Sequence, residues 1–324
     1  MPMRRSVQLS RATIAFAAVL FGTSGVAVEL LAPDLPAVTS AGWRVVLGGA
    51  VLVAISAARG VPPWQYPSQW RTTMTGAFAF VAFQLGFFTS VGLSGVATAT
   101  IITIGTGPIV AGLIDRIRRG TPLIRRWWTG VGVALAGIAL ITGAGGMNLN
   151  PAGCVSAIIA GCCFPLFGSA IRGLTNDRPP ITAAATVFGV AIIPAAALLT
   201  VGGGSPTTTP GTIAALLYLG VITTGIAYAF WSTGLARLTL SDTVTLTMLE
   251  LVVAAVLAVA ILGEVANTTT VLGITSTLVG VWVASTTSRP ADPAAHSEPA
   301  TGAAHRTDHQ PPVRRHSPTH QRPH

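Results

Sequence analysis

Ten long apolar runs, separated by short connections, dominate this chain of 324 residues. Each run has roughly 17–25 residues, the length that an α-helix needs to cross the hydrocarbon core of a membrane. Only 9% of the residues are charged, whereas a typical soluble domain has about 25%. The sequence therefore predicts an all-α polytopic membrane protein with ten transmembrane helices. The expected spans are residues 12–31, 37–58, 72–93, 96–114, 127–146, 152–171, 181–201, 212–236, 241–262 and 268–288.

Arginine alternates along the connections between these spans. All 19 basic residues are arginines, and the formal charge of +9 is spread over short clusters rather than one patch, so we expect no nucleic-acid partner. Because arginine-rich connections face the cytoplasm, both termini are predicted to be cytoplasmic, in a multi-pass protein of the cell inner (plasma) membrane. The arginines in alternate connections are Arg59 and Arg71; five between 116 and 126; Arg172 and Arg178; and Arg237.

Glycines recur at one spacing in the two halves of the chain. A constant shift of 143 residues places Gly107, Gly120, Gly130 and Gly137 in register with Glu250, Gly263, Gly273 and Gly280. With five spans in each half, the two copies have opposite orientations, so we predict an inverted 5+5 repeat. The expected divisions are a cytoplasmic N-terminus (1–11), two repeats (12–146 and 147–288) and a tail (289–324).

The tail from 289 to 324 has a different composition, rich in Pro, Ala, Thr and Arg, and contains all six histidines. It lacks the apolar residues of a core, so we predict a disordered cytoplasmic tail. The irregular histidine spacing favours a solvated segment over a metal site. Since Cys154, Cys162 and Cys163 have no zinc-binding spacing either, we expect no metal and no cofactor.

Several motifs resemble the EamA-type transporters of the drug/metabolite transporter superfamily. They are FGTSG at 21–25, Trp43-Arg44, Pro108 with the glycines that follow it, and LTMLELVVAAVLAVAILGE at 246–264. The family's proline after the glutamate is Leu251 here, which predicts a less kinked ninth helix. The resemblance implies export or exchange of amino acids, related metabolites or drugs.

Glu250 and Arg44 are charged residues within predicted spans. A carboxylate near the bilayer centre costs about 2.5–3.5 kcal/mol unless it is paired, protonated or in contact with cavity water. We therefore expect Glu250 to act in substrate binding or proton coupling; the alternative is a structural carboxyl group. Arg44 could clamp a substrate carboxylate or pair with Glu250. Alternatively, it snorkels and pairs with Glu29 or Asp34.

Polar and aromatic residues in other spans suggest a cavity. Gln84 shares a helical face with Phe80, Phe87 and Phe88, and Tyr228 and Trp231 form a similar pair. These residues could line an amphipathic cavity, or they could face lipid or pack against other helices.

Gly107 and Pro108 are the expected hinge of the fourth span, because proline removes a helical hydrogen bond. Asp115, Asp177 and Asp242 were expected to be solvated charges or helix caps at span ends.

The pattern as a whole favours a secondary transporter that exports or exchanges small metabolites or drugs by alternating access. The alternatives are a membrane channel and a non-transporting membrane scaffold. The inter-span connections contain no histidine, and the chain has no phosphate-binding loop motif, so an enzyme or an ATP-driven pump is not expected. The expected partners are a small-molecule substrate and the lipid bilayer, and the chain would act as a monomer or homodimer.

Overall fold

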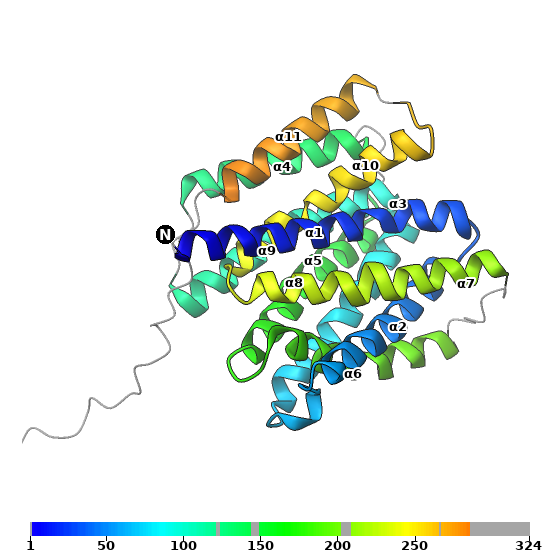
Figure 1. Ribbon diagram of the computed structural model, residues 1–324. Coiled ribbons are helices and arrows are strands. Elements are labelled where there is room, and N and C mark those ends of the chain that lie inside the picture. Colours follow the sequence, from blue (N-terminus) through cyan, green and yellow to red (C-terminus); the bar gives the residue numbers. More distant parts are fainter. Residues whose placement is uncertain (1, 121–123, 144–148, 202–208, 266, 286–324) are drawn as a thin grey trace, which may run out of the picture. The chain divides into compact units, whose positions relative to one another are not determined.

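The computed structural model describes residues 2–120, 124–143, 149–201, 209–265 and 267–285. Every regular element in these residues is a helix (Figure 1). The predicted disorder of the tail, and its six histidines, lie outside the described residues. The helices are α1 (Pro2–Leu31), α2 (Ala37–Ala58), η1 (Pro63–Gln65), α3 (Trp70–Arg119), α4 (Arg125–Thr142), α5 (Pro151–Leu174), α6 (Pro180–Val201), α7 (Pro210–Leu217), η3 (Tyr218–Ile226), α8 (Ala227–Leu235), α9 (Leu240–Thr247), α10 (Leu249–Ile261) and α11 (Thr268–Ser285).

Eight helical segments of the described residues are long and apolar enough to cross a membrane. They include all of α1, α2, α5, α6 and α11 in whole or nearly so, the continuous runs α7–η3–α8 and α9–α10, and one long segment within α3. The predicted all-α membrane class is therefore confirmed. The predicted count of ten would require α3 to cross twice and the 18-residue α4 to cross once, and it stays a prediction.

α3 contains 50 residues, about 75 Å of helix, which is more than twice the roughly 30 Å of a hydrocarbon core. Its regular backbone is interrupted at Gly95, which has φ 82° and ψ 164°. Glycine reaches this region without a steric penalty because it has no Cβ. The interruption falls between the two spans expected at 72–93 and 96–114.

Helix ends follow local sequence signals. Asn150, Thr209 and Thr239 each accept a hydrogen bond from a backbone N–H in the first turn of α5, α7 and α9, respectively. α4 ends at Gly143, whose positive φ of 71° is typical of a helix C-terminus.

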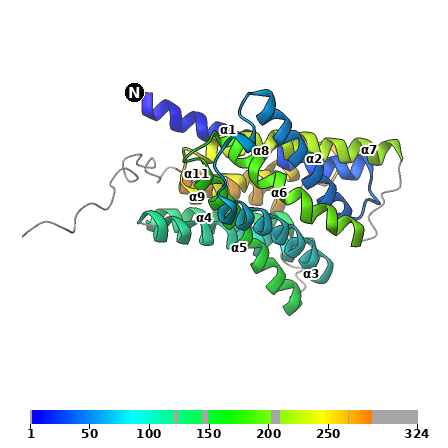
Figure 2. The ribbon, with the colours of Figure 1, turned by 90° about the horizontal axis from the view of Figure 1, so that it is seen from below.

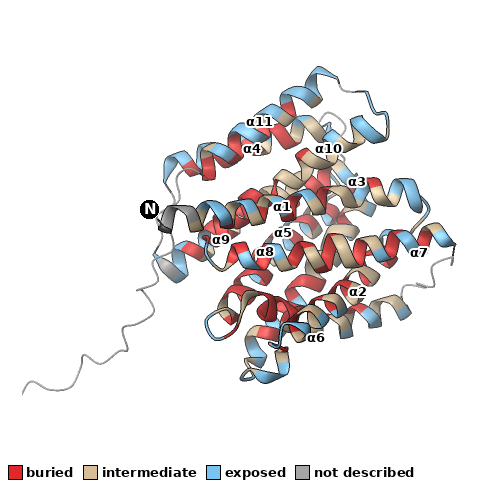
Figure 3. Ribbon diagram, in the orientation of Figure 1, coloured by how far each residue is buried: buried red, intermediate tan, exposed pale blue. Residues whose placement is uncertain are grey.

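Helices from the two halves of the chain pack against one another. α3 packs on α5, α2 on α6, α1 on α8 and α10, and α4 on α11 (Figures 1 and 2). Buried residues lie mainly on the faces between helices, whereas outer faces carry exposed apolar side chains (Figure 3). Ile193, for example, is 72% exposed and Trp282 is 62% exposed. An apolar surface of this kind is suited to lipid.

α4 and α11 lie side by side and run antiparallel. A methyl group on Gly130 would fall 2.5 Å from the backbone N of Ala284, and one on Gly137 would fall 2.5 Å from that of Thr277. Ser276 Oγ also donates a 3.0 Å hydrogen bond to the carbonyl of a residue 143 positions earlier, Val133. The repeated glycines thus bring these two backbones close together.

Candidate functional site

A cavity of about 320 Å³ lies among the helices of the bundle. Residues from α1, α2, α3, α5, η3 and α8–α10 line it. Four of the five expected binding or coupling residues are on its wall: Arg44, Gln84, Tyr228 and Glu250. They come from four different helices, so the fold brings together residues that are up to 206 positions apart in sequence.

Arg44 and Glu250 supply opposite charges to this cavity. The two side chains are close enough to interact electrostatically, but they form no direct ion pair. Arg44 also forms no ion pair with Glu29 or Asp34, so the snorkelling alternative has no partner in the described residues. Both charged groups therefore remain available to a molecule in the cavity.

A π-helical turn positions a hydroxyl group beside Arg44. In η3, Thr224 Oγ1 donates a 2.8 Å hydrogen bond to the carbonyl of Leu219, five residues earlier. The same hydroxyl accepts a 3.4 Å hydrogen bond from Arg44 Nε. Because π-helical turns are rare and recur at functional sites, η3 is a local feature that sequence periodicity does not reveal.

Glu250 lies just after an irregular turn between α9 and α10. At Met248 the helix tightens, with 3.2 Å hydrogen bonds from Met248 N to Thr245 O and from Leu251 N to Met248 O. Three-residue bonds of this kind are typical of a 3₁₀ turn. The absence of the family proline therefore leaves a local irregularity beside the carboxylate, although the sequence predicted a less kinked helix.

Aromatic side chains close the cavity at one end. We define the aromatic cluster as Phe80, Phe167, Phe188, Tyr228 and Trp231. Ring centroids are 4.7 Å apart for Phe80–Phe167 and Phe80–Phe188, and 4.8 Å apart for Phe188–Tyr228. All five residues are buried, and Phe80 and Tyr228 also contact the cavity. Such close ring packing excludes water from this region.

Trp231 is not part of the cavity wall, although the sequence suggested it. The residue is fully buried, and its indole Nε1 donates a 3.0 Å hydrogen bond to the hydroxyl of Thr247, which does line the cavity. Trp231 is three residues beyond Tyr228, so one helical turn carries it below the wall. Its contact with any ligand would be indirect, through Thr247.

Gln84 lies on the cavity wall together with Phe80, Phe83, Phe87 and Phe88. The helical spacing predicted this shared face. The wall therefore combines an amide group with large apolar surface, which is typical of small-molecule sites.

The expected hinge residues differ in position. Gly107 lines the cavity, whereas Pro108 lies inside α3 without contacting it. α3 continues through Pro108, and the non-helical backbone is at Gly95. The hinge role of Gly107 and Pro108 stays a prediction.

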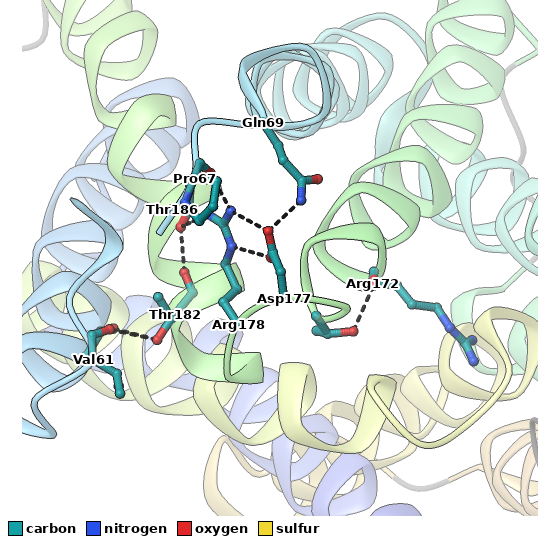
Figure 4. A network of polar contacts seen from close by, with 10 residues as sticks. Val61, Pro67, Gln69, Arg172, Asp177, Arg178, Thr182 and Thr186 are labelled. Atoms are coloured by element: carbon teal, nitrogen blue, oxygen red, sulfur yellow. Dashed lines mark hydrogen bonds and ion pairs between the residues drawn. The ribbon is translucent and has the colours of Figure 1, made fainter. Parts of the chain in front are cut away.

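A network of polar contacts joins the α2–α3 connection to the start of α6 (Figure 4). We call it the Arg178 cluster: Pro67, Gln69, Asp177, Arg178 and Thr186. The guanidinium of Arg178 donates to Asp177 at 2.9 Å, to the Pro67 carbonyl at 2.8 Å and to Thr186 Oγ1 at 3.3 Å. Gln69 donates a further 2.7 Å bond to Asp177.

A second buried contact lies at the same end of the bundle. The carboxylate of Asp115 in α3 accepts bonds from the backbone N and Oγ of Ser241 at 2.7 and 2.8 Å. Arg118 donates to Ser169 in α5 at 2.8 Å. Asp115 and Asp242 are only 3% and 2% exposed, so the expectation that they are solvated was wrong. Asp115 instead caps the start of a different helix, α9.

Other wall residues were not predicted. Phe21, Phe164, Thr100, Thr103 and Thr224 line the cavity as well. Phenylalanine and threonine are also common packing residues in membrane helices, so their residue type carried no distinguishing signal. The one available signal was polarity inside an apolar span, and it found only Arg44, Gln84 and Glu250.

The apolar helices and the cavity define a multi-pass membrane protein with room for a small molecule. The sequence profile described as "EamA-like transporter family" matches residues 11–143 and again residues 151–286. The chain belongs to this family, as the motifs predicted, and it is a membrane transporter rather than a member of a known enzyme class.

Two known proteins are similar along most of the chain. The "Uncharacterized transporter YwfM" of Bacillus subtilis (strain 168) is 31% identical over 282 residues, covering 85% of this chain and 93% of that protein. A solved structure described as "Crystal structure of protein" has a TM-score of 0.74 at 21% identity, covering 86% of this chain and 96% of that chain. The second likeness shows a shared fold.

Proposed function

We propose that this protein is a secondary transporter that exports or exchanges small amphipathic metabolites, with amino acids as the leading class. One observation carries the proposal. Arg44 and Glu250 face one cavity of about 320 Å³ with opposite charges and no ion pair between them, among aromatic side chains. A guanidinium can bind a carboxylate through two parallel hydrogen bonds, and a carboxylate can bind an ammonium group. A zwitterion with an apolar side chain complements this arrangement.

Alternating access would operate around this cavity. The aromatic cluster, the Arg178 cluster and the Asp115 contact all lie toward one end of the bundle. In α2, for instance, Arg44 and Ser56 are separated by about 18 Å of helix, and Ser56 donates a 2.6 Å bond to the carbonyl of Val61 in the connection. The connections at this end are the arginine-rich ones. These contacts support a state closed toward the cytoplasm, with the cavity facing the outer side of the cell inner membrane.

The inverted 5+5 arrangement is supported by reciprocal contacts between α4 and α11. A shift of 143 relates Gly130 to Gly273 and Gly137 to Gly280. A methyl group on Gly280 would lie 2.6 Å from Gly130 O, and one on Gly273 would lie 2.7 Å from Gly137 O. Exchanging the halves converts one contact into the other, as a two-fold axis between antiparallel helices requires. Repeats at 12–146 and 147–288, and cytoplasmic termini, follow from this arrangement and the positive-inside rule.

Proton coupling would be carried by Glu250. It is the cavity-lining carboxylate among the described residues, and it can exist as a neutral acid or as a charged base. A monomer can enclose the cavity, because all of its wall residues belong to one chain; the proposal applies equally to each protomer of a homodimer.

Counterflow in proteoliposomes tests the function. The full chain is assayed with amino acids, purine-type metabolites and cationic drugs at two pH values. We expect saturable exchange of zwitterions, and Glu250→Gln should reduce it at least tenfold and remove its pH dependence. Glu264→Gln is the matched control, because Glu264 is exposed and does not line the cavity. Unsaturable flux would indicate a channel, and an unchanged rate and pH profile in Glu250→Gln would exclude the coupling role.

A further inference from the structure

A second, smaller cavity of about 130 Å³ adjoins the first one. α2, α3 and α6 supply its wall, which is apolar apart from Gln84 and Thr89. Three residues line both cavities: Val45, Gln84 and Phe88. The two spaces therefore share a boundary, and we call the smaller one the side pocket.

The helix packing explains why the side pocket exists. α2 packs closely on α6: a methyl group on Gly42 would fall 2.6 Å from Cδ2 of Leu199. By contrast, α2 has little direct contact with the first half of α3. The space left between α2 and α3 is bordered by buried Val81 and Ala195, which are 7% and 2% exposed.

The boundary residues suit a ligand that extends from one cavity into the other. Gln84 offers an amide at the junction, while Phe88 and Val45 offer apolar surface on both sides. The charges of Arg44 and Glu250 belong only to the main cavity. A molecule with a charged head at these residues would therefore direct an apolar group toward the side pocket.

We propose that the side pocket between α2, α3 and α6 binds the apolar side chain of the transported zwitterion and selects for its length. The inference rests on the proposed function and names the substrate class more narrowly: amino acids with an extended aliphatic side chain. Burial of each additional methylene group can raise affinity by up to about fourfold until the pocket is filled.

A lipid acyl chain is the alternative occupant, since rim residues Val38 and Leu85 are 42% and 39% exposed on the lipid-facing side. The shared boundary with the charged cavity favours the substrate. A lipid in the side pocket would affect short and long substrates equally, and this difference separates the two occupants.

Uptake into proteoliposomes of the full chain tests the proposal, with alanine, norvaline, norleucine and 2-aminooctanoate as separate probes. In the wild type, KM should fall at least tenfold from alanine to norleucine. Ala195→Leu places extra methyl groups in the side pocket. It should raise the KM of norleucine at least tenfold while that of alanine changes less than twofold.

Ala196→Leu is the matched control, because Ala196 is the next residue of α6 but is exposed and outside the side pocket. It should alter neither KM. Leu198→Ala enlarges the same pocket without adding bulk, and it should move the preference toward 2-aminooctanoate. This second variant keeps the test informative if Ala195→Leu does not fold.

The outcomes separate the two proposals. If the wild type transports alanine but shows no preference for longer chains, or if Ala195→Leu changes both probes equally, the side pocket has no selective role and the proposed function stands. If the wild type transports none of the four probes, the amino-acid class is wrong and the side-pocket proposal fails with it.

Discussion

Asp177 is held by several hydrogen bonds in the turn between α5 and α6, outside the membrane-spanning segments. The Arg178 guanidinium, foremost, and the amide of Gln69 donate to its carboxylate. These bonds lower the pKa of the Asp177 carboxyl group below its ordinary value. The stabilisation is therefore fully present above the unfolded-state pKa and is lost as pH falls through the lower, folded-state pKa.

We expect Asp177→Asn to lower the thermal unfolding midpoint by about 2–4 °C at pH 7, because this partly exposed pair is worth only a modest amount. The gap from the wild type should close as the pH falls below about 4. Asp34→Asn is the control, since Asp34 is exposed and makes no hydrogen bond or ion pair in the described part of the chain. The measurement is a melting curve in detergent at several pH values; an equal gap at pH 3.5 and pH 7 would contradict the assignment.

Sequence reasoning located the charged residues of the cavity but not its full wall. Arg44 and Glu250 stand out because charge in an apolar span is costly, so few alternatives explain them. Thr224 has no such cost, since threonine can satisfy its hydroxyl within its own helix, as it does with Leu219. Trp231 was misplaced because a shared helical face does not determine depth along the helix axis.

At the scale of elements, the α4–α11 pair depends on glycine. A methyl group on Gly280 would lie 2.3 Å from Ala134 N and 2.6 Å from Gly130 O, and backbone atoms cannot yield as a flexible side chain can. We expect Gly280→Ala to force the two helices apart and to lower the unfolding midpoint by at least about 4 °C.

Gly132→Ala is the control on the same helix pair, because a methyl group there would have no neighbour within 4 Å. Replacing glycine by alanine in an open helical position favours the helix by roughly 0.5–1 kcal/mol, so this variant should be as stable as the wild type or slightly more so. Melting curves and size-exclusion profiles in detergent measure both variants. Equal stability of Gly280→Ala and Gly132→Ala would show that the close approach does not limit packing.

The elements themselves were largely predictable, because apolar length determines membrane helices almost directly. Their irregularities were less so. Gly95 was one glycine among 36, and only the interruption of α3 shows which one carries the special backbone conformation. The π-helical turn at η3 and the tight turn at Met248 depend on packing between helices, which hydropathy does not encode.

For the whole molecule, the open question of topology concerns α3. A single crossing would leave more than half of its roughly 75 Å outside the hydrocarbon core, although its residues are apolar throughout most of that length. Two crossings that meet at Gly95 satisfy the length and preserve the arginine alternation. The ten-span prediction therefore places Val96, which is 63% exposed, at the outer surface and Arg59 at the cytoplasmic surface.

Single cysteines distinguish these topologies after Cys154, Cys162 and Cys163 are replaced by alanine. A membrane-impermeant maleimide should label Val96→Cys in intact cells, but should label Arg59→Cys only after permeabilisation. If Val96→Cys is unreactive in both conditions, α3 crosses once and Gly95 lies within the bilayer. In that case the two halves would no longer have equal numbers of spans, and the inverted relation between Gly107 and Glu250 would lose its geometric basis. Labelling at the predicted sides would instead support the two-fold relation that the α4–α11 contacts suggest.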